Sequence, residues 1–191
     1  NNTYGIIQVE EKKRRTVKNY NYDYNSTLSE ESELPTLYCD MDHVLVNFLG
    51  GADKELGQPF IKTDKDKRWS EIHKNKSFWE NLEWMPGAKR LWSFVSKYNS
   101  HILSAYTPAD SNSTPGKMKW LRKNLRLTQR SRIHLVLRSQ KQNFAMTNNK
   151  PNVLIDDHEK NIREWESKGG IGVHHISVSN TLNELKRLGY K

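Results

Sequence analysis

Short apolar runs recur along the chain and alternate with amphipathic segments. Runs of this length are typical of strands buried in a parallel sheet, where both faces of each strand are covered. We interpret the runs at Leu37–Cys39, His101–Ser104, Ile133–Leu137, Val153–Ile155 and Ile171–His175 as strands. The pattern therefore predicts a sheet whose strands are separated by longer connections.

The amphipathic segments have apolar residues three or four positions apart, which predicts helices with one buried face. These faces consist of Leu91, Val95 and Tyr98; Met118, Leu121 and Leu125; Ile162 and Trp165; and Leu182, Leu185 and Leu188. Thr114-Pro115 is typical of an N-cap followed by the first helical residue, and Asn180 is the expected N-cap of the last helix. Alternating strands and helices indicate an α/β fold, a doubly wound, Rossmann-like parallel sheet flanked by helices.

The chain divides into an arm and one domain. Residues 1–34 are interpreted as an N-terminal arm without an assigned fold, and residues 35–191 as the domain. Within the domain, residues from about 50 to 85 are polar, compatible with helix and rich in Phe and Trp. This composition indicates a small helical cap inserted after the first strand, and Pro86-Gly87 ends it.

Two pairs of aspartates follow two of the predicted strands. Asp40 and Asp42 come after the first strand, and Asp156 and Asp157 come after the fourth. In open α/β sheets ligands bind at the carboxyl ends of the strands, so the two pairs can face one site. Several ionised carboxylates close together need a compensating cation, and hard oxygen ligands favour Mg²⁺. The sequence therefore predicts a magnesium site and, with it, phosphate chemistry.

Composition restricts the class of protein further. A chain of 191 residues is long enough for one domain with a hydrophobic core. Its composition, with 35% hydrophobic and 28% charged residues, is typical of a soluble protein. No apolar stretch approaches the length of a membrane span, and the N-terminus does not resemble a signal peptide, so we expect a cytoplasmic protein that binds no membrane. Cys39, the only cysteine, is expected to pack as a small apolar residue in the first strand.

The net charge of +9 comes from one region. Between Ser111 and Ile155 there is no acidic residue, whereas ten lysines and arginines fall there. For any single lysine, a solvated helix face is the simpler interpretation. A block of one charge beside a carboxylate cluster favours phosphate-bearing substrates such as nucleotides, and it leaves nucleic-acid binding through residues 111–155 open.

Four motifs resemble those of the haloacid dehalogenase superfamily, in the same order. Asp40-Met41-Asp42-His43-Val44-Leu45-Val46 resembles the first motif, Ile102-Leu103-Ser104 the second, Lys141 the third and Asp156-Asp157 the fourth. Within the superfamily the chain most resembles the 5′(3′)-deoxyribonucleotidases, over roughly residues 37–165. The segments that carry this likeness are Val44–Gly51, Phe78–Leu82, Pro86–Ala88, Gly116-Lys117 with Trp120, and Leu154–Asp157. Four motifs in order are far more specific than one Asp-x-Asp.

The resemblance implies a role for each of the four aspartates. Asp40 would be the nucleophile that forms an aspartyl-phosphate, and Asp42 would protonate the leaving group and then activate water. Asp156 would bind Mg²⁺ directly, together with the Asp40 carboxylate and the Asp42 backbone carbonyl, and Asp157 would be a further metal ligand. Each residue alone could equally be a turn residue or a helix cap, so this interpretation depends on both pairs and on the motif order.

The resemblance also implies a phosphate site. Ser104 would donate its hydroxyl to a phosphoryl oxygen, and Lys141 would neutralise charge on the nucleophile and the transferring group. Ser104 taken alone is more simply a turn residue. Lys150 is a second candidate for the lysine because it lies closer to the acid pair, but Lys141 follows the Ile133–Leu137 strand as the family's lysine follows its strand.

Substrate selectivity is expected from the helical cap. Phe48, Phe78 and Trp79 match positions that stack on the nucleobase in the resembled nucleotidases, and stacking tolerates different bases. The alternative for these rings is a small aromatic core within the insertion. Three features depart from the family's pattern: His43 replaces a glycine of the first motif, Ala105 stands where a second hydroxyl often follows the second motif, and the insertion is shorter.

The predicted function is a Mg²⁺-dependent hydrolase of the 5′-nucleotidase type, which dephosphorylates (deoxy)nucleoside monophosphates. Two alternatives use the same fold. One is a phosphatase acting on nucleic-acid 3′ or 5′ ends, which the basic residues 111–155 favour. The other is a non-catalytic module that binds nucleic acid or protein, against which the intact set of motif residues argues.

Overall fold

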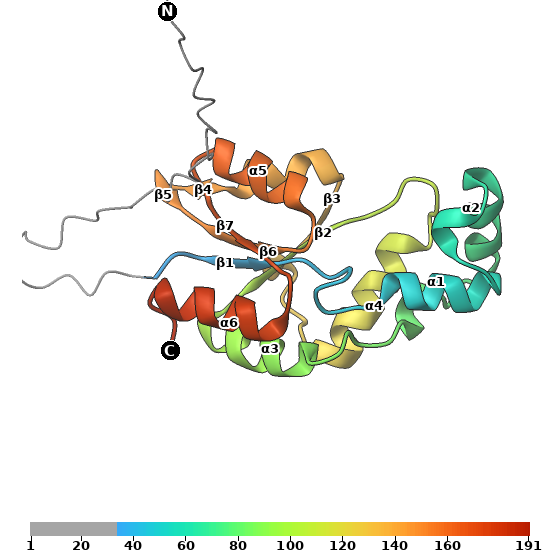
Figure 1. The fold of residues 1–191 in the computed structure, drawn as a ribbon, viewed down its shortest axis with the longest axis horizontal. Coiled ribbons are helices and arrows are strands. Elements are labelled where there is room, and N and C mark those ends of the chain that lie inside the picture. Colours follow the sequence, from blue (N-terminus) through green and yellow to red (C-terminus); the bar gives the residue numbers. More distant parts are fainter. Residues whose placement is uncertain (1–33) are drawn as a thin grey trace, which may run out of the picture. The chain divides into compact units, whose positions relative to one another are not determined.

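The computed structural model of the chain describes residues 34–191, so the predicted N-terminal arm lies outside the described residues except for Leu34 (Figure 1). The centre of the described part is a five-stranded parallel sheet in the order β3-β2-β1-β6-β7. Its strands are β1 (Leu37–Cys39), β2 (His101–Ala105), β3 (Ile133–Val136), β6 (Val153–Asp156) and β7 (Ile171–His174). With helices on both faces, this is the doubly wound α/β fold that the sequence predicts, and the prediction is confirmed.

The strand register brings the aspartate-bearing strand ends together. Cys39 of β1 lies opposite both Ile102 of β2 and Ile155 of β6. Because these strands are parallel, Asp40 and Asp156, the next residue along each, reach the same edge of the sheet. The Asp40 N–H continues the ladder by donating to the Ile155 carbonyl at 2.9 Å. The first and fourth motifs therefore meet as expected.

Helices cover both faces of this sheet (Figure 1). On one face lie α3 (Ala88–Val95), which the 3₁₀ segment η3 (Ser96–Tyr98) extends, and α6 (Val178–Arg187). On the other face lie α5 (Glu159–Ser167) and the 3₁₀ segment η5 (Arg138–Phe144). None of the helices in residues 34–191 combines the length and the apolar character needed to cross a membrane.

Each face of the sheet has its own apolar core. Successive residues of a strand point to opposite faces, so Cys39 packs in the larger cluster and Tyr38 in the smaller one. Trp165 of α5 fills the smaller cluster, with its ring centroid 5.6 Å from that of Tyr38. Cys39 is fully buried among apolar residues, as the sequence predicts.

A run of short helices occupies the chain between β1 and α3. It consists of α1 (Phe48–Leu56), the 3₁₀ segment η1 (Phe60–Lys62), α2 (Lys65–Lys74) and the 3₁₀ segment η2 (Trp79–Asn81). The segment η2 packs against α4 (Ser113–Leu125), which follows β2. Figure 1 shows α1 and α2 to one side of the sheet. We call residues 48–81 the helical insertion.

Two helix starts differ from the sequence predictions. The helix α6 follows Ser177, whose hydroxyl accepts the N–H of Asn180 at 3.2 Å, so the prediction of Asn180 as the N-cap is wrong. Serine and asparagine are both favoured caps, and the pattern could not distinguish them. The helix α4 begins at Ser113, before the predicted N-cap Thr114.

The sequence does not predict a small hairpin that precedes β6. Its strands are β4 (Met146–Thr147) and β5 (Lys150–Pro151), and a further 3₁₀ segment, η4 (Arg130–Arg132), precedes β3. Asn148 and Asn149 form the hairpin turn with φ of 50° and 60°. Asparagine tolerates this left-handed conformation, so two adjacent asparagines were the available signal for the turn.

Candidate active site

The loop after β1 carries the first two predicted site residues. The Oδ1 atom of Asp40 accepts the N–H of Met41 at 2.7 Å, which orients the carboxylate. The chain then turns, and His43 adopts a φ of 59° while its N–H donates to the Val46 carbonyl at 2.8 Å. This left-handed conformation favours glycine, so His43, in place of the resembled family's glycine, adopts it at an energetic cost.

Lys141 lies between two of the predicted metal ligands. Its ammonium group contacts Asp40 Oδ2 at 2.9 Å and Asp156 Oδ2 at 2.7 Å, and its side chain is only 3% exposed. Burial alone would lower the pKa of Lys141, but the charges of Asp40 and Asp156 and the hydrogen bonds to them outweigh burial and raise it. The lysine therefore stays charged and links the ends of β1 and β6. The other lysine candidate, Lys150, is exposed in the hairpin.

Asp156 is held by further donors. Its Oδ1 accepts the N–H of His158 at 2.9 Å, and the side-chain amide of Asn161 lies 3.0 Å from both carboxylate oxygens. Asn161 belongs to the first turn of α5, so this helix fixes the orientation of the carboxylate. The sequence interpretation did not identify Asn161, because nothing in the helical pattern distinguishes a buried asparagine that supports a site from an exposed one.

Asp40, Asp156 and Asp157 form a group that can hold a metal ion. One carboxylate oxygen of each lies within 4.8 Å of the others. Burial, followed by the charges of Asp40 and Asp156, raises the pKa of Asp157 to about 6, whereas His43 acts to lower it. The pKa of Asp156 is also raised, first by burial and then by the charge of Asp40. Three carboxylates face one ammonium group here, so a divalent cation with oxygen ligands fits both the charge and the donor set.

Asp42 and Ser104 are joined by a lysine to which the sequence interpretation gave no role. The Nζ atom of Lys117 donates to Asp42 Oδ2 at 2.7 Å, to Ser104 Oγ at 3.1 Å and to the Ala105 carbonyl at 2.7 Å. Lys117 lies on the buried face of α4, 75 positions from Asp42 in the sequence. Its one sequence signal was the segment Gly116-Lys117, which resembles the deoxyribonucleotidases. The Asp42 side chain is not part of the metal-binding group.

The three predicted base-contacting residues lie in an aromatic cluster. Phe48, Phe78 and Trp79 are 8%, 4% and 2% exposed. Phe48 stacks on Trp79 with ring centroids 5.3 Å apart, and Phe78 packs edge-on against both rings. The indole N–H of Trp79 donates to Asp110 at 2.6 Å. These contacts match the alternative of a small aromatic core, and stacking of the rings on a nucleobase stays a prediction.

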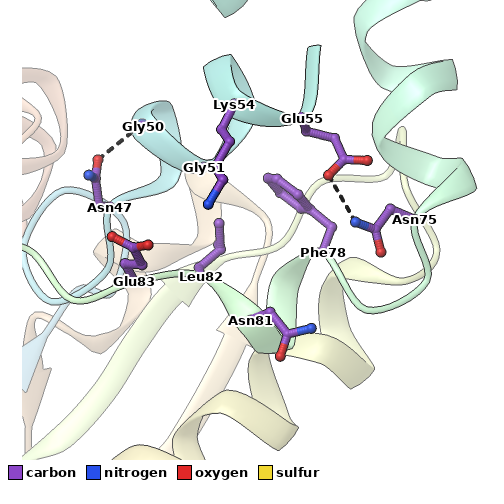
Figure 2. Close-up of a pocket in the computed structure, with 10 residues that line it drawn as sticks. All are labelled: Asn47, Gly50, Gly51, Lys54, Glu55, Asn75, Phe78, Asn81, Leu82 and Glu83. Carbon is purple, nitrogen blue, oxygen red and sulfur yellow. Dashed lines mark hydrogen bonds between the residues drawn. The ribbon is translucent and has the colours of Figure 1, made fainter. Parts of the chain in front are cut away.

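A cavity of about 410 Å³ lies beside this cluster, between α1 and the segment that contains η2 (Figure 2). It is lined by Asn47, Gly50, Gly51, Lys54, Glu55, Asn75, Phe78, Asn81, Leu82 and Glu83. In Figure 2 the Asn75 amide donates to Glu55, at 2.9 Å, across one end of the cavity. Phe78 lines the cavity, whereas Phe48 and Trp79 do not.

Comparison with known proteins gives fold-level likenesses only. Neither a protein-family model nor a curated protein matches the sequence. Among solved structures, a hydrolase from Streptococcus pneumoniae TIGR4 is 10% identical with a TM-score of 0.48, covering 81% of this chain and 99% of that chain. A haloacid dehalogenase-like family hydrolase from Streptococcus pneumoniae is 13% identical with a TM-score of 0.44, covering 80% and 91%. A hydrolase from Pseudomonas syringae is 15% identical with a TM-score of 0.44, covering 82% and 90%. At these identities, support for an activity has to come from the residues of the site.

Proposed function

We propose that this protein is a Mg²⁺-dependent phosphomonoesterase of the haloacid dehalogenase type, which hydrolyses (deoxy)nucleoside monophosphates through an aspartyl-phosphate on Asp40. The observation that carries the proposal is the contact of one buried lysine, Lys141, with both Asp40 and Asp156, next to Asp157. Gathering three carboxylates around one ammonium group is costly for stability. Such a cluster in a fold of this kind therefore favours a functional site.

The metal ion would be held by Asp40, Asp156 and Asp157, with the Asp42 backbone carbonyl as a further ligand. Bound Mg²⁺ supplies Lewis-acid stabilisation of the charge on the phosphoryl oxygens. Lys141 adds a fixed positive charge beside the nucleophile, and Ser104, whose Oγ accepts from Lys117, would donate its hydroxyl to a phosphoryl oxygen.

The reaction would take place in two steps. An Asp40 oxygen attacks phosphorus while Asp42 gives a proton to the departing ester oxygen. Asp42 then takes a proton from the water that attacks the aspartyl-phosphate, which releases inorganic phosphate and regenerates Asp40. The fixed orientation of the Asp40 carboxylate, through the Met41 N–H at 2.7 Å, supports its role as an in-line nucleophile.

The nucleotide substrate is supported by the resemblance of residues 37–165 to the deoxyribonucleotidases. The cavity beside Phe78 adds amide groups from Asn47, Asn75 and Asn81, which can hydrogen-bond a polar ligand. For a base to stack on Phe48 or Trp79, the aromatic cluster would have to open, because both rings are buried.

A phosphatase screen over a panel of nucleoside monophosphates, with Mg²⁺ and with chelator, tests the proposal. We expect release of inorganic phosphate that requires Mg²⁺ and that is faster for nucleotides than for small sugar phosphates. Hydrolysis at an undiminished rate in chelator would contradict the mechanism. The absence of any phosphate release under all conditions would favour the non-catalytic binding module.

A phosphatase that acts on nucleic-acid 3′ or 5′ ends is the second candidate. It is favoured by the exposed face of α4, which carries the cations Lys119, Arg122 and Lys123, and by Arg126 directly after the helix. Charges at this spacing lie on one side of a helix and can follow a phosphate backbone. Activity on phosphorylated oligonucleotides should then exceed activity on mononucleotides and should fall steeply with salt. Equal salt dependence for both substrates would exclude this candidate.

A further inference from the structure

Lys117 is a buried lysine whose three hydrogen bonds all lie at the proposed active site. An ammonium group has three N–H donors, and those of Lys117 reach Asp42 Oδ2, Ser104 Oγ and the Ala105 carbonyl at 2.7, 3.1 and 2.7 Å. The side chain is only 1% exposed. With every donor in use and no space to move, the direction of its bond to Asp42 is fixed.

The packing of α4 on η2 puts Lys117 at this place. Gly116 allows the approach, since a Cβ atom at this position would lie 2.4 Å from the Cβ of Trp79. The Trp79 ring covers the ammonium group of Lys117 at 5.2 Å, and Asp110 holds the indole N–H of Trp79. Lys117 therefore extends from a rigid, tightly packed element, as the support of a catalytic group requires.

The contact with Lys117 uses one oxygen of Asp42 and leaves the other free. In the described part of the chain, Asp42 Oδ1 is buried and has no hydrogen-bond partner. A buried carboxylate oxygen without a donor is uncommon and calls for a functional explanation. Among the described residues, Lys117 is therefore the donor that holds the Asp42 carboxylate, through Oδ2.

We propose that Lys117 is a positioning residue that holds Asp42 through Oδ2 and so orients its carboxyl group for proton exchange in both steps of the reaction; this rests on the proposed phosphatase function. When the bond from phosphorus to the ester oxygen breaks, the electron pair stays on that oxygen and the proton comes from the Asp42 carboxyl group. In the second step a water oxygen bonds to phosphorus, its proton passes to the Asp42 carboxylate, and the bond from phosphorus to Asp40 breaks. Lys117 keeps its own protons throughout.

The two buried lysines contact different aspartates of the Asp40-Met41-Asp42 segment. Lys141 contacts Asp40 and Asp156, and thus serves the nucleophile and the metal site. Lys117 forms its salt bridge with Asp42. Lys117 also donates to Ser104 Oγ, so its loss should impair proton transfer far more than the attack of Asp40 on phosphorus, without sparing that attack completely. A residue with a merely structural role would affect both equally.

Esters with different leaving groups distinguish a loss of proton transfer from a loss of the attack of Asp40 on phosphorus. An alkyl ester such as a nucleoside monophosphate needs protonation as it departs, whereas 4-nitrophenolate leaves readily without it. We would measure the first turnover of Lys117→Met with each ester at saturating Mg²⁺. We expect the alkyl ester to react about 10²-fold more slowly or worse than with the wild type. The nitrophenyl ester should change little, and Lys117→Arg should recover part of the loss.

Two controls distinguish an effect through Asp42 from a general effect of removing a lysine. Lys186→Met, at an exposed position of α6, should behave like the wild type with both esters. In an Asp42→Asn background, Lys117→Met should cause no further loss, because a residue that acts through Asp42 has no effect once Asp42 cannot transfer a proton. If Lys117→Met does not fold, as judged by thermal unfolding, Lys117→Arg and Lys117→Gln are compared in the same way.

Equal losses with both esters, or losses that add to those of Asp42→Asn, would overturn the role proposed for Lys117. No loss with either ester would overturn it too. If the wild type hydrolyses neither ester with Mg²⁺, the proposed function fails and the inference fails with it. Hydrolysis by the wild type together with equal losses in Lys117→Met refutes the inference alone.

Discussion

The carboxylate cluster at the ends of β1 and β6 and the aromatic cluster of the helical insertion are both buried, yet burial has opposite consequences in the two. Burial of Asp40 and Asp156 around Lys141, with the half-buried Asp157 beside them, costs free energy because charges lose water. Burial of Phe48 and Trp79 stabilises the fold. The same low exposure thus favours function in the first region and packing in the second. Substitutions in each region should separate activity from stability.

The largest effect is expected for Asp40→Asn. The amide keeps the shape of the side chain but cannot attack phosphorus, so turnover should fall by more than about 10³-fold. The temperature of unfolding should change little or rise, since one of the crowded negative charges is removed. Steady-state kinetics and thermal unfolding of the same sample measure both. Substantial residual turnover would remove Asp40 from the nucleophile role.

Removal of the metal ion should also cause a large loss of turnover. Chelator should abolish activity and Mg²⁺ should restore it, whereas Ca²⁺ should inhibit because its larger, looser coordination misplaces the nucleophile. Asp156→Ala should lose the response to Mg²⁺. Wild-type metal affinity in that variant, measured by titration calorimetry, would show that the ligand assignment is wrong.

Asn161→Ala tests whether Asn161 orients the Asp156 carboxylate for binding of the proposed metal ion. Asn161 donates to both oxygens of Asp156, and loss of such a partner weakens metal binding by about 10–100-fold. The concentration of Mg²⁺ that gives half of the maximal activity should rise by this factor, with a smaller change in the maximal rate. A loss of maximal rate at unchanged Mg²⁺ requirement would contradict the role of Asn161.

The aromatic cluster should show the opposite behaviour. If Phe48 and Trp79 are core residues, Phe48→Ala and Trp79→Ala should each lower the free energy of unfolding by about 3–5 kcal/mol. A loss of this size lowers Tm by about 10 °C in a chain of this length. Hydrolysis of a minimal ester well below Tm should be retained. An unchanged Tm with nucleotide binding weakened by about 1–3 kcal/mol would instead support base stacking.

A smaller effect is expected of pH on the stability of the metal-free protein. The pKa of Asp157 in the folded state, about 6, is above its ordinary value, so the folded state binds this proton more tightly than the unfolded state. Its contribution to stability is therefore present at low pH and is lost as pH rises from about 4 through about 6. Thermal unfolding in chelator should show this decline, and Asp157→Asn should reduce it. A Tm that rises over the same range would contradict the crowding of charges.

The contrast between the two regions also explains what could be predicted from the sequence. The five strands and the acidic pairs are local patterns, and parallel pairing brings Asp40 and Asp156 to one edge, so the fold and the outline of the site were accessible. The roles of Lys117 and Asn161 were not, because each depends on one side-chain contact between distant segments. The pattern likewise could not decide whether Trp79 faces a ligand or the core.

Trapping of the covalent intermediate tests the central claim most directly. The Asp42→Asn variant should form the aspartyl-phosphate from 4-nitrophenyl phosphate but hydrolyse it slowly, because it lacks the base that activates water. Mass spectrometry of rapidly quenched, protease-digested samples with Mg²⁺ should find one added phosphoryl group on the peptide that contains Asp40. The added group should disappear in chelator and in an Asp40→Asn, Asp42→Asn double variant. A phosphoryl group on another residue, or turnover by the wild type without any phosphorylated peptide in the Asp42→Asn variant, would contradict the account.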